Sequence, residues 1–166
     1  MVIFGIDPGT VNTGYGVIRV SGNSMVWVDC GVIRTDAKST MPAKLACIHT
    51  GLIDKMRFYK PDRVCVEEAF YAKNVHTTLV LGQARGVALL AAVQSGAEVA
   101  EYSPREIKKS VVGNGNAQKD QVEFMIKKML ALPKNEYHAD AYDALAAAVC
   151  DFQHYAFSKT LTTMKR

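Results

Sequence analysis

The stretch that decides the fold is residues 2–20, which read VIFGIDPGTVNTGYGVIRV. Residues 2–6 are a short apolar run, which is typical of a buried β-strand, and Asp7 ends this run. A segment of turn-forming residues follows at 8–13, and residues 14–20 form a second strand-like run. Because the connection is short, we expect the two strands to be antiparallel neighbours.

Working outward, the chain adds a third strand, a helix and a fourth strand. A hairpin turn at residues 21–24 leads into a strand at 25–33. Apolar residues then recur at helical spacing from Leu45 to Met56, and Pro61 closes that segment. We expect the next strand, at residues 63–70, to be parallel to the first, because the intervening crossover is long.

The second half predicts helices around one more strand. We expect a helix rich in small residues at about 78–94 and a strand at 98–102. The cap signature Ser103-Pro104-Arg105-Glu106 starts the next helix. Another helix contains residues 122–130 and ends before Pro133, and an alanine-rich helix runs from 139 to about 155.

These elements predict a single α/β domain. Its mixed five-stranded sheet would have three antiparallel strands followed by two parallel ones, flanked by helices. We place this domain at residues 1–157 and expect residues 158–166 to be a flexible C-terminal tail.

Composition is that of a globular protein, with 49% hydrophobic and 22% charged residues among 166. No apolar run approaches the ~20 residues that a membrane span needs, and the N-terminus lacks a basic leader. We therefore expect a cytoplasmic protein with no membrane partner. The net charge of +4 suits a polyanionic partner without identifying one.

The cysteines are widely spaced among apolar neighbours, so we expect buried free thiols at Cys30, Cys47, Cys65 and Cys150.

Several acidic residues stand where a carboxylate needs an explanation. Asp7 ends the first strand, and Glu67 and Glu68 interrupt the fourth. Asp140 and Asp143 are three residues apart on one face of the last helix. If the first and fourth strands are neighbours, these side chains cluster, and such a cluster is unfavourable unless a cation neutralises it. Mg²⁺ takes hard oxygen ligands, and two ions about 4 Å apart can assist phosphodiester hydrolysis. Taken singly, each acid can instead cap a turn or lie on a solvated face.

Five blocks of sequence, in a fixed order along nearly the whole chain, carry a resemblance to a known family. They are GIDPG at 5–9 with TGYGVI at 13–18, EEAFYAKN at 67–74, LGQARG at 81–86, KKSVVG at 108–113 and ADAYDAL at 139–145. Together they resemble the RuvC family of Holliday-junction resolvases. The resemblance implies a ribonuclease-H-like fold and a homodimer. It also implies an endonuclease that makes paired, symmetric nicks in a four-way DNA junction during recombination and DNA repair.

The resemblance also assigns roles to residues. It gives catalysis and metal binding to Asp7, Glu67, Asp140 and Asp143. These carboxylates would hold Mg²⁺, two ions per active site, with Mn²⁺ as a substitute. It selects Glu67 over Glu68, since adjacent strand residues point to opposite faces. Some relatives carry histidine at the position of Asp140. We interpret His138 as a bystander, because a helix would turn it away from the acidic face.

For DNA binding, the resemblance points to Phe70, Lys73, Lys108 and Lys119. The lysines would neutralise phosphates and make affinity salt-dependent, although Lys108 can also merely solvate a helix surface. Phe70 matches an aromatic residue that stacks on an unpaired base at the crossover, and ordinary core packing is its alternative. The small residues at 82–88 would let another helix approach closely, either at a dimer interface or within this fold. A branch-migration motor complex is a further implied partner.

Two other functions fit parts of the sequence. GIDPGT at 5–10 also resembles the first phosphate-binding turn of actin-like sugar kinases and chaperone ATPases, which would make the chain an ATP-binding phosphotransferase. Those proteins need a second, similar domain, and 166 residues leave no room for one. The other alternative is a non-catalytic junction-binding protein. The intact set of acids argues against it, because binding to phosphates alone would favour the removal of negative charge.

Overall fold

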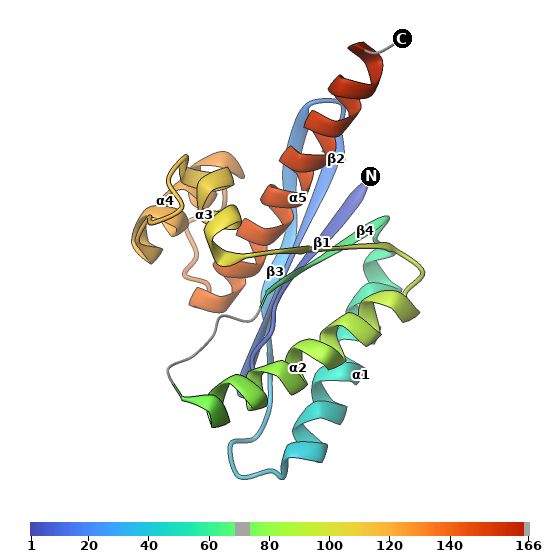
Figure 1. Ribbon diagram of the computed structural model, residues 1–166, viewed down its shortest axis with the longest axis vertical. Coiled ribbons are helices and arrows are strands. Elements are labelled where there is room, and N and C mark those ends of the chain that lie inside the picture. Colours follow the sequence, from blue (N-terminus) through green and yellow to red (C-terminus); the bar gives the residue numbers. More distant parts are fainter. Residues whose placement is uncertain (69–73, 165–166) are drawn as a thin grey trace.

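The computed structural model describes residues 1–68 and 74–164 and shows a five-stranded mixed sheet between two layers of helices (Figure 1). The strands are β1 (Val2–Asp7), β2 (Asn12–Ser21), β3 (Ser24–Arg34), β4 (Arg63–Glu67) and β5 (Glu98–Tyr102). Their order across the sheet is β3-β2-β1-β4-β5. β1, β2 and β3 are antiparallel neighbours, and β4 runs parallel to both β1 and β5. The expected strand plan is confirmed.

The helices form two layers with separate cores. α1 (Met41–Tyr59) and α2 (Val75–Gln94) lie on one side of the sheet, and α3 (Pro104–Val112), α4 (Lys119–Met129) and α5 (Ala139–Met164) lie on the other (Figure 1). Side chains of a strand alternate between the two. Phe4 and Ile6 pack into the α1–α2 core, and Ile3 packs into the α5 core. Asp7 is four residues after Ile3 on the same strand, so its side chain points to the same face of the sheet, toward α5.

Glycines in β1 and β2 let α5 lie directly on the sheet backbone. A Cβ atom added at Gly5 would overlap the carbonyl oxygen of Ala144, and one added at Gly14 would overlap that of Asp140. At Gly16 a Cβ would lie 2.6 Å from the backbone nitrogen of Leu145. Only glycine, which has no Cβ, permits this approach. The start of α5 is therefore fixed against the ends of β1 and β2.

Two element boundaries differ from the sequence expectation near the middle of the chain. β4 ends at Glu67 rather than Phe70, because its neighbour β5 ends at Tyr102, where Ser103 caps α3. α2 begins at Val75 rather than near residue 78, because the Asn74 side chain accepts a hydrogen bond from the His76 backbone N–H and caps the helix.

The last helix is also longer than expected. α5 continues to Met164, so its expected end near residue 155 was wrong. Between these positions the sequence holds neither glycine nor proline, the residues that most often end a helix. The expected flexibility of residues 158–166 stays a prediction, as do the domain limits.

Two expectations about composition need correction. By length and composition alone, α2 would be able to cross a membrane, contrary to the expectation from the sequence. A single helix of this kind is weak evidence for a membrane span, and four of its alanines pack in the core between α1 and the sheet, namely Ala84, Ala88, Ala91 and Ala92. All cysteines are free, as expected, but Cys47 is exposed rather than buried.

The glycine contact makes a testable prediction. Gly5→Ala should lower the free energy of unfolding by about 1–3 kcal/mol or more, because the new methyl group meets backbone atoms that cannot rotate away. Denaturant unfolding followed by circular dichroism measures this change. Gly51→Ala in α1 is the matched control, since its Cβ would lie 2.9 Å from the Ile33 side chain and not against backbone atoms. Equal stabilities for wild type and Gly5→Ala would contradict the close-contact interpretation.

Candidate active site

Three carboxylates from distant parts of the chain meet at the C-terminal end of β1. Carboxylate oxygens of Asp7, Asp140 and Asp143 all lie within 4.8 Å of one another. Asp7 ends β1 and pairs with Gly14 of β2, and the same Gly14 lies against the backbone of Asp140. The turn after Asp7 is held by Thr13, whose buried hydroxyl donates to the Gly9 carbonyl oxygen at 2.7 Å. The sheet therefore positions both the strand acid and the helix acids.

Glu67 lies beside this cluster. β1 and β4 pair in parallel through Ile6 and Val66, so Asp7 and Glu67 occupy the next position of each strand. Glu67 lines a pocket of about 380 Å³ together with Asp7 and Asp143. Glu68 is exposed. The structure thus brings all four sequence-predicted acids to one place, with Glu67 at the wall of the pocket rather than inside the closest group of three.

Repulsion and burial strongly perturb the acids. Burial, followed by repulsion from Glu67, Asp143 and Asp140, raises the pKa of Asp7 to about 8. Burial and the charge of Asp143 raise the pKa of Glu67 to about 7. Fully ionised, this group of carboxylates is therefore an unfavourable arrangement in the protein alone.

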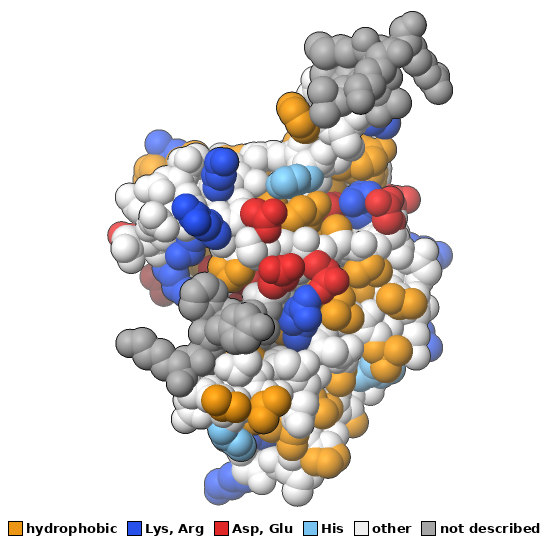
Figure 2. All heavy atoms as spheres, in the orientation of Figure 1, with side chains coloured by type: hydrophobic (Ala, Val, Ile, Leu, Met, Phe, Trp, Pro, Cys, Tyr) orange, Lys and Arg blue, Asp and Glu red, His pale blue; other side chains and the backbone are white. Residues whose placement is uncertain are grey.

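Lysines supply part of the compensating charge. Lys119, at the start of α4, donates a hydrogen bond from Nζ to Oδ2 of Asp143 at 2.7 Å, which raises the pKa of the lysine. Lys108 of α3 lines the same pocket, and its charge, like that of Lys119, lowers the pKa of Glu67. Figure 2 shows acidic side chains gathered near the centre of one face with basic side chains on either side of them. Phe70 and Lys73, the other two expected DNA contacts, lie outside the described residues.

His138 is placed differently from the expectation. α5 begins at Ala139, so His138 precedes the helix, and the helix does not turn it away. Its Nδ1 atom lies 3.2 Å from Oδ2 of Asp140 and accepts a hydrogen bond from the Asp140 backbone N–H at 3.4 Å. The bystander interpretation was therefore wrong in its physical basis. The missed signal was that the residue falls before the first helical turn, where the backbone takes another path.

The donor set fits a hard divalent cation. Three carboxylate oxygens lie close enough to share one ion, and a cation would relieve the repulsion that raises the pKa of Asp7. Oxygen donors of this kind suit Mg²⁺ or Mn²⁺, whereas thiolates and imidazoles suit softer metals. The described residues therefore form a candidate metal centre at the end of β1.

A mixed sheet that gathers acids from β1, β4 and the last helix in one pocket defines the class of ribonuclease-H-like nucleases. The family model described as crossover junction endodeoxyribonuclease RuvC matches residues 3–151. The RuvC protein of Pelotomaculum thermopropionicum is 44% identical over 97% of this chain and 98% of its own length. That of Geotalea uraniireducens is 47% identical over 100% of this chain and 96% of its own length. The chain belongs to the RuvC family of crossover junction endodeoxyribonucleases.

Solved structures agree with this assignment. Thermus thermophilus RuvC, determined in complex with a Holliday junction substrate, has a TM-score of 0.87 and 28% identity and covers 95% of this chain and 96% of that one. The yeast mitochondrial Holliday junction resolvase, at 15% identity and a TM-score of 0.66, shows the shared fold alone. These relationships do not favour the actin-like phosphotransferase or a non-catalytic protein.

Raised pKa values of buried acids predict a pH effect on stability. In metal-free protein the pKa of Asp7 is about 8 when folded and near its ordinary value of 3.8 when unfolded. The folded state therefore binds more protons, and its stability falls as pH rises from about 4 to 8, by at most about 1.4 kcal/mol per unit. We expect the stability of Asp7→Asn to fall much less over this pH range. The variant should therefore be more stable than wild type at pH 8.5 but not at pH 4.5. Urea unfolding in the presence of a chelator tests this, and identical pH profiles would show that burial and repulsion do not raise the pKa of Asp7.

Proposed function

We propose that this chain resolves Holliday junctions by hydrolysing phosphodiester bonds at the pocket lined by Asp7, Glu67 and Asp143, with Asp140 beside it. The observation that carries the proposal is the convergence of these acids from three separate segments, at a cost in repulsion that a solely structural role does not explain. Family membership supports the reaction, and the Holliday junction complex of the Thermus thermophilus relative supports the substrate.

The acids would hold Mg²⁺, for which we expect two ions per site with Mn²⁺ as a substitute. Bound there, the metal would lower the pKa of water and stabilise the charge of the leaving oxygen. Asp7 is the natural centre of the set, since it interacts with all three other acids. Asp140 and Asp143 orient their carboxylates toward it from α5, and Nδ1 of His138 lies 3.2 Å from one oxygen of Asp140.

Lys119 and Lys108 are proposed to contact DNA phosphates at the rim of the pocket. Lys119 already neutralises Asp143 in the protein alone. Because its side chain is 74% exposed, it is free to move to a phosphate when a cation takes over that role. The expected contacts of Phe70 and Lys73 with DNA stay predictions, as do the cytoplasmic location and the partnership with a branch-migration motor.

We propose that two copies pair through an exposed apolar stripe of α2, here called the α2 seam. Its members are spaced three or four residues apart and are Val75, Leu79, Gly82, Gly86, Leu90 and Val93. The four larger side chains are 52–74% exposed. A Cβ added at either glycine would meet nothing within 4 Å, so another helix has room to approach. A twofold pairing of the seam with itself would give two active sites, one for each strand to be cut.

The choice of Glu67 over its neighbour predicts a clear difference between two variants. Glu67→Gln should cut a synthetic four-way junction about 100-fold more slowly or worse in Mg²⁺, because it loses a charged oxygen at the pocket. Glu68→Gln, which alters the exposed neighbour, should cut at nearly the wild-type rate. Single-turnover cleavage measures the rates, and a gel-shift titration checks that both variants still bind the junction. A wild-type protein that binds junctions without cutting them in Mg²⁺ or Mn²⁺ would overturn the proposed function.

If the dimer forms through the α2 seam, a charge introduced into the seam should separate the two copies. Leu90→Glu should convert the dimer into a monomer of 18.2 kDa, because it places a charge in an apolar contact. Phe124→Glu is the control, since Phe124 is also exposed but lies on α4, on the other side of the sheet. Sedimentation velocity distinguishes the two species. A Leu90→Glu protein that sediments as wild type does would show that the α2 seam is not the interface.

A further inference from the structure

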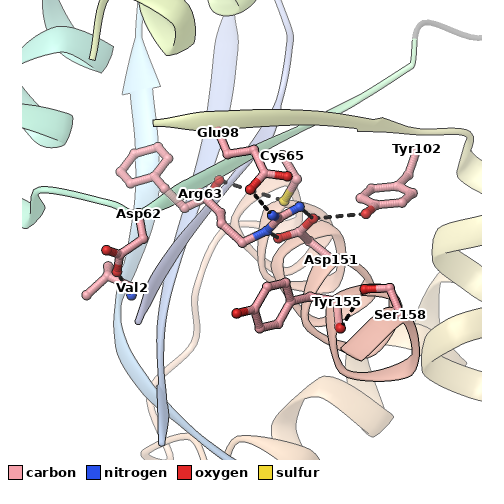
Figure 3. Close-up of polar contacts among 10 residues, drawn as sticks. Val2, Asp62, Arg63, Cys65, Glu98, Tyr102, Asp151, Tyr155 and Ser158 are labelled. Atoms are coloured by element: carbon pink, nitrogen blue, oxygen red, sulfur yellow. Dashed lines mark hydrogen bonds and ion pairs between the residues drawn. The ribbon is translucent and has the colours of Figure 1, made fainter. Parts of the chain in front are cut away.

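A buried ion pair joins α5 to β4 away from the acidic pocket (Figure 3). The Nε atom of Arg63 donates to Oδ2 of Asp151 at 2.7 Å, and Nη2 donates to Oδ1 at 2.9 Å. The Asp151 side chain is completely buried, and that of Arg63 is 10% exposed. Two parallel bonds between a planar guanidinium and a carboxylate fix the distance between the groups and their mutual orientation.

Further contacts hold both members of the pair. The hydroxyl of Tyr102 on β5 donates to Oδ1 of Asp151 at 2.9 Å. Oε2 of Glu98, also on β5, lies 2.6 Å from Nη1 of Arg63. Figure 3 shows these side chains converging from the two strands and the helix. The Tyr155 ring of α5 adds a contact, with its centroid 5.2 Å from the guanidinium carbon.

The ion pair and the pocket lie on the same strand and helix at matched separations. Arg63 and Glu67 are four residues apart on β4 and so point to the same face, about 13 Å from one another. Asp151 and Asp143 are eight residues apart on α5, which is about 12 Å along its axis. The strand and the helix run in opposite directions here. The register that pairs Arg63 with Asp151 therefore also places Glu67 near Asp143.

Elsewhere the contact of α5 with the sheet is apolar. Gly5 lies against backbone atoms of Ala144 and Ala148, and Gly16 lies against Leu145, so these glycines hold the start of α5 on β1 and β2. Apolar contacts have little directional preference. The directional pair between β4 and α5 fixes the register farther along the helix, and fixing register is the best-attested use of a buried polar pair.

We infer that Arg63 and Asp151 are positioning residues that set the register of α5 along β4 and thereby place Asp143 and Asp140 opposite Glu67 and Asp7. This inference rests on the proposed function of the pocket. A helix that slides by a single residue moves its carboxylates by about 1.5 Å, and misplacement of about 1 Å can slow an enzyme by about 100-fold. The pair therefore controls the reaction without touching DNA or metal.

The decisive variant replaces the pair with apolar groups while leaving no orphaned partner. It combines Arg63→Met and Asp151→Leu with Tyr102→Phe, because the tyrosine hydroxyl would otherwise lose its acceptor. Glu98 is 68% exposed on its side chain and can turn to solvent. Apolar replacement of a buried ion pair usually preserves folding, so the variant separates register from stability. Tyr102→Phe alone is the first control. Leu52→Ala, in the core on the α1 side of the sheet, is a second that destabilises the protein away from α5 and the ion pair.

The first readout is Mn²⁺ binding to the DNA-free protein by titration calorimetry, and the second is single-turnover cleavage at saturating Mg²⁺. We expect the triple variant to bind Mn²⁺ about 10-fold or more weakly and to cut about 10- to 100-fold more slowly. Its junction affinity should stay near that of wild type. Both controls should keep wild-type Mn²⁺ binding.

Several outcomes would count against the inference. It is overturned if the triple variant binds Mn²⁺ and cuts as wild type does, or if Leu52→Ala weakens Mn²⁺ binding equally. If the triple variant does not fold, Arg63→Lys replaces it, since lysine keeps the charge but not the two-bond fork. Wild-type Mn²⁺ binding in that variant likewise overturns the inference. If the wild-type protein does not cut junctions, the proposed function is contradicted instead. The comparison of Mn²⁺ binding between variants still tests the positioning role.

Discussion

The close approach of α5 to the backbone of β1 and β2 is the constraint on which the rest of the structure depends. Glycines at positions 5, 14 and 16 remove the side chains that would hold the helix away, and the alanine-rich helix matches them. Because Gly14 lies against Asp140 and pairs with Asp7, the same contact that builds the core also assembles the acids. The contact that packs α5 on the sheet therefore also brings Asp7 and Asp140 together.

That arrangement places mutually repelling carboxylates at the end of the strands, and their repulsion lowers the stability of the folded protein. The repulsion and burial appear as the raised pKa values of Asp7 and Glu67. Compensation comes from Lys119 within the site and from the core contacts that hold α5 in place. The Arg63–Asp151 pair holds the same helix farther along its axis. A destabilised site of this kind is prepared for a cation that the chain does not itself provide.

The two faces of the sheet carry different tasks. The face under α5, α3 and α4 forms the acidic pocket and its basic rim, whereas α1 and α2 close the other core. α2 buries alanines toward the sheet and leaves larger apolar side chains exposed. Separating the proposed dimer contact from the acidic pocket in this way would let two copies associate without blocking either pocket.

The sequence by itself determined the order and type of the elements, the mixed sheet, the family and the four acids, because apolar periodicity, cap residues and ordered motifs are local signals. Tertiary structure alone decided the rest. β4 stops where its neighbour β5 stops, His138 reaches Asp140 because the helix has not yet begun, and Arg63 meets Asp151 across 88 residues of chain. These features depend on which strand or helix lies alongside, and no local pattern records that.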